Sequence, residues 1–287
     1  MNSKICYCGG SFARFTKTRF YSMVKCNSCG LVKTKKTLSD KEISALYNNK
    51  YYIFDPVREM KDELIAKAHL QSLQKKITKG RLLDVGCGKG YFLLEAKKAG
   101  FKVKGVEISK DAAKFAKDSG LDIFNGTLEN FNSKEKFDAI TMFDLIEHLS
   151  RPLKALKIAK SLLKKDGILY IETPNIESAY RKYSPIRNYW SGYNKFHIVL
   201  FSPKSLTIML RKVGFSNIET KTDEIKIFSK DILWKPGFGI LFKDILKLFK
   251  MNKTISNLKK FKDKPKVIKP KLGKTNKGDV LHAYAKN

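Results

Sequence analysis

The sequence has no long apolar run and very little arginine. None of its hydrophobic stretches approaches the roughly 20 residues that a membrane-spanning helix needs. Its first residues include lysine and cysteine rather than the apolar stretch of a signal peptide. These absences favour a cytoplasmic protein. The 287 residues, 43% of them hydrophobic, suit one full α/β domain with a small addition and exclude a disordered chain.

Basic residues exceed acidic ones by 58 to 27, which gives a formal net charge of +31. An anionic partner, either nucleic acid or a membrane surface, is one interpretation. However, 50 of the basic residues are lysine and only 8 are arginine, the residue best suited to bidentate phosphate recognition. A general compositional bias toward lysine therefore explains the charge better than a dedicated nucleic-acid site. The excess is steepest in residues 228–287, which hold 16 basic and 4 acidic residues.

Four of the five cysteines lie within the first thirty residues, as Cys6-x-Cys8 and Cys26-x-x-Cys29. In a reducing compartment such a cluster is more typical of a metal site than of disulfides. Four thiolates suit tetrahedral zinc, and four protein ligands leave no open position for catalysis. The spacing predicts a structural zinc in a zinc-ribbon-like subdomain over residues 1–50. The alternative is four reduced thiols on a small β-hairpin.

Strands and helices alternate from about residue 80, which is typical of a parallel sheet with helices on both faces. We expect strands at 82–85, 102–108, 121–124, 137–143, 168–173, 215–226 and 279–285. We expect helices at 58–77, 91–99, 110–119, 152–165 and 203–213, the last one capped by Ser202. The seventh strand is expected to pair beside the sixth and to close the edge of the sheet.

One strand–turn–helix unit carries the clearest chemical signal. An apolar strand ends in Asp84 and is followed by Gly86, Gly88 and Gly90. Glycines in such a turn let the backbone approach a ligand closely. Asp84 would repel a pyrophosphate but pair with a cation, and Glu107, after the next strand, can accept both hydroxyls of a ribose. An adenosine with a cationic amino-acid tail fits this combination, which predicts S-adenosylmethionine (SAM) as the cofactor.

This unit resembles the first motif of class I SAM-dependent methyltransferases, and further motifs follow in the order of that family to about residue 226. The resemblance implies an α/β, Rossmann-like, seven-stranded methyltransferase domain over residues 51–287. It also implies the cofactor contacts, with the methionine portion over Gly86 and Gly88, the ribose on Glu107, the adenine between Thr127 and Leu128, and the sulfonium beside the backbone at Phe143.

The N-terminal part also resembles a known arrangement. Methyltransferases of glycan and secondary-metabolite pathways carry a pair of cysteine knuckles, a Cys-Gly-Leu-Val stretch and a Tyr-x-x-x-Tyr stretch. Cys29-Gly30-Leu31-Val32 and the tyrosines at 47 and 51 match that pattern.

A second candidate group follows the fourth strand. Asp144, Glu147 and His148 resemble the Glu-x-x-Glu-His motif of ubiquinone-pathway O-methyltransferases and small-RNA 2′-O-methyltransferases, which bind a divalent metal there. In the RNA enzymes a further histidine follows a Thr-Pro-Asn loop, as His197 does here. These four residues are the candidate catalytic set, holding a metal that lowers the pKa of a substrate hydroxyl. Two alternatives stay open: His148 as a metal-free general base or substrate contact, and a purely structural Glu147–His148 pair.

These features predict a SAM-dependent methyltransferase that acts on a hydroxyl of a sugar, a glycan precursor or a prenylated phenol. The first alternative is an RNA 2′-O-methyltransferase, which the charge and His197 favour and the scarcity of arginine disfavours. The second is a non-catalytic zinc-ribbon binding module on a methyltransferase fold, against which the intact cofactor motifs argue.

A basic insertion at about residues 228–275 has apolar residues at helical spacing, with lysines on the opposite face. One interpretation is an amphipathic helix in a lipid interface, where a lipid-linked acceptor would be presented at the inner face of the membrane. The other is a helix that packs this face onto the methyltransferase core or a second subunit.

Overall fold

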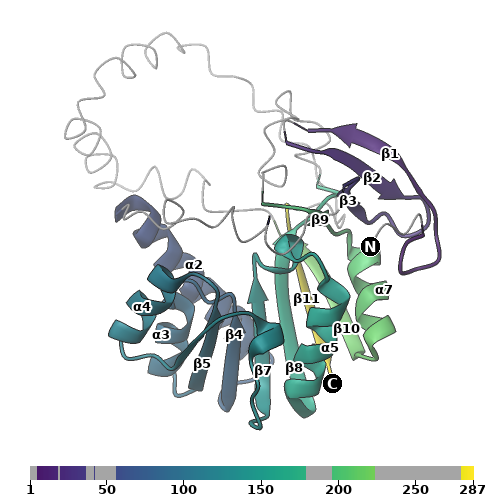
Figure 1. Ribbon diagram of the computed structural model, residues 1–287. Helices are drawn as coiled ribbons and strands as arrows, with labels where there is room; N and C mark the ends of the chain where they lie inside the picture. Colours follow the sequence, from purple (N-terminus) through teal and green to yellow (C-terminus); the bar gives the residue numbers. More distant parts are fainter. Residues whose placement is uncertain (1–4, 19, 37–41, 43–55, 179–195, 224–278) are drawn as a thin grey trace, which may run out of the picture. The chain divides into compact units, whose positions relative to one another are not determined.

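The computed structural model describes residues 5–18, 20–36, 42, 56–178, 196–223 and 279–287, which all lie in one of two compact units of the chain (Figure 1). The basic insertion at 228–275 and the boundary expected near residue 50 lie outside the described residues. None of the helices in the described part is long and apolar enough to cross a membrane.

A seven-stranded sheet forms the centre of this unit, in the order β10-β11-β8-β7-β4-β5-β6. Its strands are β4 (Arg81–Val85), β5 (Lys102–Glu107), β6 (Ile123–Asn125), β7 (Phe137–Phe143), β8 (Leu163–Pro174), β10 (Ser216–Asp223) and β11 (Val280–Lys286). The strands from β6 to β8 are parallel, and β11 is antiparallel to both of its neighbours. The chain leaves β4 toward β6 and then returns to β7 on the other side. The switch point of this topology, where open α/β sheets bind ligands, therefore lies between β4 and β7.

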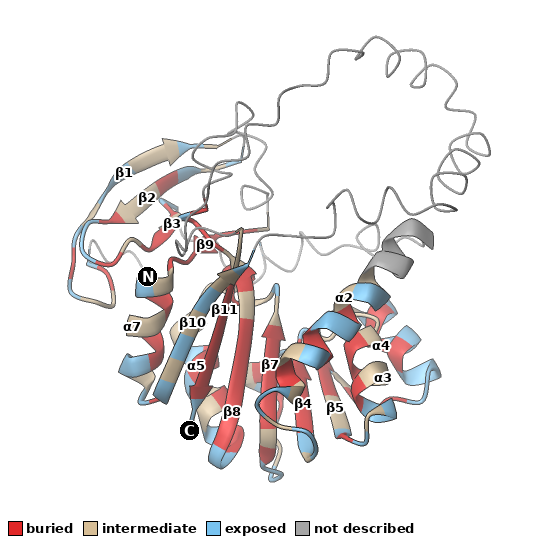
Figure 2. Ribbon diagram, turned by 180° about the vertical axis from the view of Figure 1, so that it is seen from behind, coloured by how far each residue is buried: buried red, intermediate tan, exposed pale blue. Residues whose placement is uncertain are grey.

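Helices cover both faces of the sheet, as the alternating pattern predicted (Figure 1). Leu82 packs with α2 (Pro56–Gln74), α3 (Tyr91–Lys98) and α4 (Lys110–Asp118) in one core cluster. Leu83, the next residue, joins the other cluster with α5 (Pro152–Leu162) and α7 (Pro203–Val213). Successive residues of a strand point to opposite faces, so these apolar runs fill two cores at once. Figure 2 shows the central strands β4, β7 and β8 largely buried.

The position of the seventh strand differs from the expectation. β11 does not close the sheet edge but lies between β8 and β10. Its side chains explain this placement, because Leu281 and Ala283 enter one core cluster and Tyr284 the other. A strand that is apolar on both faces is stable only where other elements cover both faces, as in the interior of the sheet. β10 alternates exposed and half-buried residues, which suits a strand at the edge of the sheet.

The end of α5 also differs from the expectation, because the helix stops at Leu162 and β8 begins at the next residue. The side-chain amide of Asn287 donates to the carbonyls of Lys160, Leu163 and Lys164 at 3.1–3.3 Å. Carbonyls at a helix end have no partner within the helix, so this remote amide stabilises the earlier ending. The sequence carries no local signal for such a contact.

A smaller sheet contains the N-terminal strands β1 (Phe12–Lys17), β2 (Ser22–Cys26) and β3 (Val32–Thr34). We call residues 5–34, with the four cysteines, the cysteine ribbon. Its fourth strand, β9 (Val199–Leu200), comes from much later in the chain and pairs with β3. β9 leads directly into α7, where the hydroxyl of Ser202 accepts from the amide of Ser205, as expected of an N-cap.

Candidate functional site

The predicted cofactor residues gather at the carboxyl ends of β4 and β5, beside the switch point. Asp84 lies near the end of β4, and its backbone is in register with Gly105 on β5. Its carboxylate is fully buried and accepts a hydrogen bond from the Thr141 hydroxyl at 2.7 Å. Burial raises the pKa of Asp84 to about 7, although Thr141 and the charge of His69 act against the rise. A cationic ligand would favour the ionised form.

Glu107, the last residue of β5, binds the glycine turn. One carboxylate oxygen accepts from the amide of Gly88 at 2.8 Å and the other accepts from the amide of Ser109 at 2.7 Å. Burial raises the pKa of Glu107, and these amides counteract the rise. Carboxylate oxygens can accept more than one bond each, so the same group retains the capacity for ribose hydroxyls.

Two of the glycines in the turn are required by close approach. At Gly86, where φ is 78°, a Cβ atom would lie 3.0 Å from Cδ1 of Leu145. At Gly90, where φ is 80°, a Cβ would lie 2.5 Å from Cδ1 of Leu121. Gly90 thus serves the packing of α3 against its neighbours, in addition to any contact with a ligand.

The remaining predicted cofactor residues lie at the same edge. Thr127 precedes the short 3₁₀ helix η1 (Leu128–Asn130), and Leu128 is buried. Phe143, the last residue of β7, stacks on the ring of His69 with centroids 3.9 Å apart. These residues thus lie at the edge of the sheet where the sequence analysis expected them, and their role in binding SAM stays a prediction.

The second candidate group forms after β7. Glu147 and His148 lie on the 3₁₀ helix η2 (Ile146–His148), and His197 arrives from the segment before β9. The Nε2 atoms of His148 and His197 lie 3.9 Å and 3.8 Å from Oε1 of Glu147. One ligand atom from each residue lies within 4.8 Å of the others. We call these three residues the carboxylate–histidine group.

Asp144 is not a member of this group, although the sequence pattern suggested four ligands. Its backbone adopts the left-handed conformation, with φ at 45°, and its amide donates to the carbonyl of Glu172 at 3.0 Å. Burial and then the charge of Asp144 raise the pKa of Glu147 well above its usual range. Asp144 thus acts on the group through its charge.

Hydrogen bonds orient His148 and Glu147 within the carboxylate–histidine group and indicate which ring nitrogen of His148 carries a proton. Nδ1 of His148 lies 3.0 Å from the carbonyl oxygen of Phe196, and because a carbonyl only accepts, Nδ1 carries the proton. Burial lowers the pKa of His148 to about 4, although hydrogen bonds with the backbone of Phe196 and Asp144 act against the fall, so the ring is neutral at pH 7. Oε2 of Glu147 accepts from the Thr173 hydroxyl at 2.9 Å.

Oε1 of Glu147 is a buried oxygen with no hydrogen-bond partner among the described residues. Buried polar atoms are rarely left in this state, because an unmade hydrogen bond is costly. A divalent cation fits this observation, since the two imidazoles and the carboxylate are the ligand types that such ions take. A proton shared with a bound hydroxyl would also satisfy the oxygen.

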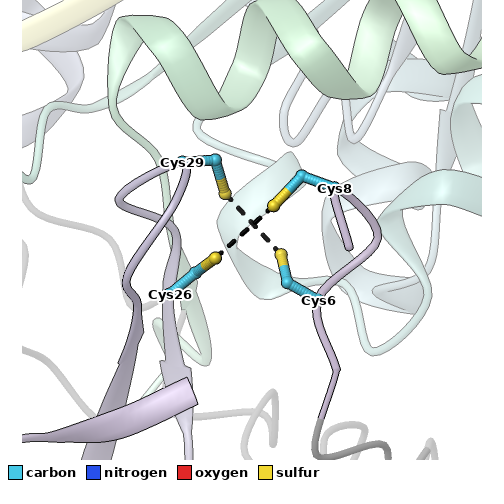
Figure 3. Close-up of side chains that lie close together, drawn as sticks. All are labelled: Cys6, Cys8, Cys26 and Cys29. Atoms are coloured by element: carbon cyan, nitrogen blue, oxygen red, sulfur yellow. Dashed lines mark hydrogen bonds between the residues drawn. The ribbon is translucent and has the colours of Figure 1, made fainter. Parts of the chain in front are cut away.

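The four cysteines come together as predicted, with the sulfurs at the corners of a compact group (Figure 3). The Sγ atoms of Cys6 and Cys29 lie 3.6 Å apart and those of Cys8 and Cys26 lie 3.5 Å apart. Tetrahedral zinc with bonds of about 2.3 Å has sulfur–sulfur edges of about 3.8 Å. Burial alone would raise the pKa of Cys26, but hydrogen bonds from the amides of Cys29 and Ser28 and from the thiols of Cys8 and Cys29 lower it to about 7. The donor set therefore fits zinc despite the short Cys6-x-Cys8 spacing.

A further polar cluster was missed by the sequence analysis. Glu172, on β8, contacts Nε2 of His69 at 2.9 Å and Nδ1 of His282 at 3.2 Å. Burial alone would raise the pKa of Glu172, but the hydrogen bond and charge of His69 and the charge of His282 lower it. The available signal was the presence of a charged residue in each of two apolar strands, β8 and β11. We call these three residues the Glu172 cluster.

Comparisons with known sequences agree with this architecture. A family model described as a methyltransferase domain matches residues 57–220, more than half of the 287 residues. An uncharacterised protein of Methanocaldococcus jannaschii is 31% identical over 196 residues, which cover 65% of this chain and 93% of that protein. A ubiquinone biosynthesis O-methyltransferase of Actinobacillus pleuropneumoniae is 38% identical over 107 residues, which cover 33% of this chain and 46% of the enzyme. The chain thus matches about half the length of that enzyme.

Solved structures show the same fold. A SAM-dependent methyltransferase from Archaeoglobus fulgidus superimposes with a TM-score of 0.54 at 21% identity, covering 81% of this chain and all of that one. A SAM-dependent methyltransferase from Thermotoga maritima gives a TM-score of 0.53 at 21% identity, covering 85% of this chain and 97% of that one. Together with the family match, these similarities confirm the Rossmann-like fold and the motif resemblance. The chain belongs to the methyltransferase domain family and is a SAM-dependent methyltransferase.

Proposed function

We propose that the protein transfers the methyl group of SAM to a hydroxyl oxygen, and that the carboxylate–histidine group binds and activates this hydroxyl. The observation that carries the proposal is the unpartnered Oε1 of Glu147, which lies within 3.9 Å of two imidazole nitrogens. A hydroxyl or a metal-bound hydroxyl placed there would give the carboxylate its missing partner.

The position of this group relative to the glycine turn supports the proposal. Leu145, which leads into η2, contacts the turn so closely that a Cβ on Gly86 would lie 3.0 Å from its side chain. Glu147 follows Leu145 by two residues, and we therefore expect it near the part of the turn that the family resemblance assigns to the methionine portion. A nucleophile must reach the methyl carbon in line with its bond to sulfur, so this proximity is what the reaction needs.

In this proposal, one set of residues binds SAM and another removes the proton of the acceptor. Asp84 and Glu107 bind the amino group and ribose of SAM and orient its methyl group. The proton of the acceptor hydroxyl passes to the pair formed by Nε2 of His148 and Oε1 of Glu147, which lie 3.9 Å apart, while the Phe196 carbonyl holds the Nδ1 proton of His148. His197 and Glu147 orient the hydroxyl beside it. The oxygen then forms a bond to the methyl carbon while the carbon–sulfur bond breaks, which leaves S-adenosylhomocysteine.

A divalent cation is compatible with the same residues. Glu147, His148 and His197 would hold it, and such an ion lowers the pKa of a coordinated hydroxyl. Proton removal by His148 alone and removal assisted by a metal differ in their response to chelators. Treatment with EDTA under conditions that leave the zinc content of the cysteine ribbon unchanged, followed by rescue with magnesium, therefore distinguishes them.

The acceptor we propose is a sugar, a glycan precursor or a prenylated phenol, including lipid-linked forms. Support comes from relatives that are named ubiquinone biosynthesis O-methyltransferases. The ribose of an RNA is a second candidate, which His197 favours because it completes the carboxylate–histidine group. In the cysteine ribbon we propose a structural zinc on Cys6, Cys8, Cys26 and Cys29, which takes no part in the reaction.

Transfer of label from methyl-labelled SAM into fractionated cell extract tests the acceptor class. The proposal predicts label in a glycan or lipid fraction that is stable to ribonuclease. Label that ribonuclease releases would instead support the RNA alternative, which also predicts salt-sensitive binding of RNA. Label only on nitrogen or carbon atoms would contradict an oxygen acceptor.

A further inference from the structure

The carboxylate–histidine group is assembled from two segments that are held in different ways. Glu147 and His148 follow β7 directly, and β7 is paired on both sides within the main sheet. Phe196 and His197 lie at the start of the described segment 196–223, just before β9. What fixes these two residues therefore decides whether the group is complete.

The cysteine ribbon supplies much of that support. Ile198 donates its amide to the carbonyl of Glu147 at 3.0 Å, and its carbonyl accepts from the amide of Thr34 at 2.9 Å. The next two residues pair with β3, Val199 with Lys33 and Leu200 with Val32. One residue, Ile198, thus joins the ribbon on one side to the backbone of Glu147 on the other.

The cysteines in turn hold β3 and the start of α7. The amide of Cys26 donates to the carbonyl of Leu31 at 2.8 Å, which closes the knuckle directly before β3. The carbonyl of Cys29 accepts from the hydroxyl of Ser202 at 3.1 Å, and the Tyr7 hydroxyl donates to the carbonyl of Ser205. The knuckles therefore contact the chain on the C-terminal side of β9, while β3 contacts β9 itself.

Apart from its cysteines, the ribbon buries few apolar residues. Leu31 joins three of the cysteines in the core cluster that includes Ile198 and Val199, and Met23 and Val32 pack with Ile176 and Leu200 in a small separate cluster. Sheets this small depend on a metal or a disulfide for stability, because they bury too little apolar surface. The geometry of β9 is thus expected to follow the state of the four cysteines.

We propose that the cysteine ribbon, closed by its metal, is the positioning element of the acceptor site. It holds the backbone of residues 196–198 so that His197 faces Glu147 and the Phe196 carbonyl keeps the proton of His148 on Nδ1. This inference rests on the proposed function, because it assigns the ribbon a role in activating the acceptor. Asp84 and Glu107 sit on β4 and β5, which the ribbon does not pair with, so we expect SAM binding not to depend on it.

Thr34→Pro in the full chain separates the ribbon from the site without touching a cysteine. Proline has no amide hydrogen, so the bond to the carbonyl of Ile198 is lost while the four sulfurs remain. Cys26→Ser removes a proposed ligand instead. Thr18→Ala is the matched control, because Thr18 lies in the turn between β1 and β2, and among the described residues its side chain bonds to Phe20 and Tyr21 of that turn alone.

Four measurements are made on each variant: zinc content, SAM affinity by calorimetry, hydrogen exchange of peptides covering 196–201, and methyl transfer into the extract fraction that the wild type labels. Thr34→Pro is expected to keep its zinc and its SAM affinity. Its exchange over 196–201 should rise at least about 10-fold, and methyl transfer should fall about 10- to 100-fold, as for other groups that orient a reacting side chain. Cys26→Ser, or chelation of the wild type, should give the same changes with loss of zinc.

The inference is overturned if Thr34→Pro or zinc removal leaves exchange over 196–201 and methyl transfer at the level of Thr18→Ala. It is also overturned if SAM affinity falls in parallel with methyl transfer, since that indicates a general loss of structure. His197→Ala separates this failure from failure of the proposed function. If His197→Ala keeps full activity, the acceptor site is wrong, whereas the exchange result still decides whether the ribbon holds residues 196–201.

Discussion

His197 and Glu147 face each other with Nε2 and Oε1 3.8 Å apart, too far for a hydrogen bond and close enough to share a third atom. The contrast with the Glu172 cluster is informative, because Glu172 contacts both of its histidines at 3.2 Å or less. Oε2 of Glu172 thus contacts both of its histidines, whereas Oε1 of Glu147 has no hydrogen-bond partner among the described residues. The spacing around Glu147 is what we expect of a site that receives a ligand.

Binding of SAM should depend on pH through Asp84. Because burial raises the pKa of this carboxyl to about 7, lowering the pH from 8 to 6 protonates it and removes the charge that pairs with the amino group of SAM. We expect the affinity for SAM to fall toward acid pH, by up to about tenfold per unit below that pKa. Titration calorimetry across this range measures it. Asp84→Asn should bind SAM weakly at every pH, and a wild-type profile that is flat would argue against the pairing.

The cysteine ribbon should contain about one zinc ion per chain. Elemental analysis of the purified protein measures this directly, and Cys29→Ser should reduce the content to near zero. Loss of the metal should also lower the melting temperature, because metal binding and folding of a small metal site are coupled. Metal-free protein with four readily titrated thiols would show that the cysteines are merely close together.

The Glu172 cluster should stabilise the fold in a pH-dependent way. The folded pKa of Glu172 is lowered by His69 and His282, so its stabilising contribution is present above the unfolded value of 4.5 and is lost as the pH falls through the folded pKa. We expect Glu172→Gln to reduce the free energy of unfolding at pH 7 by about 1–3 kcal/mol. In urea denaturation the difference from wild type should shrink at acid pH. A difference that is constant with pH would mean that charge is not responsible.

A divalent cation, if it binds the carboxylate–histidine group, should stabilise the wild type and not Glu147→Gln. Glutamine keeps the size of the side chain but lacks the charge that attracts a cation. Thermal unfolding with and without added magnesium or manganese measures this, after the protein has been loaded with zinc. Equal shifts in both proteins would place the cation elsewhere and leave His148 as the base.

The cofactor motifs could be predicted from the sequence because their geometry is local. Asp84 and the glycines lie on one strand and its turn, and Glu107 ends the strand that pairs beside it. The position of β11 between β8 and β10 was not evident from the sequence, because strand order depends on which strands have apolar residues on both faces and must be covered by helices on both sides. His69, Glu172 and His282 meet only after three separate elements pack. The tie between Thr34 and Ile198 likewise joins distant parts of the chain, and no local pattern indicates it.

The most direct test of oxygen methylation at this site compares SAM affinity with methyl transfer in His148→Ala and His197→Ala. We expect both variants to bind SAM with wild-type affinity, because neither histidine is one of the predicted cofactor residues. Methyl transfer into the fraction that the wild type labels should fall about 10²- to 10⁴-fold, the usual contribution of a positioned acid–base group. Full methyl transfer by both variants would contradict the proposed acceptor site.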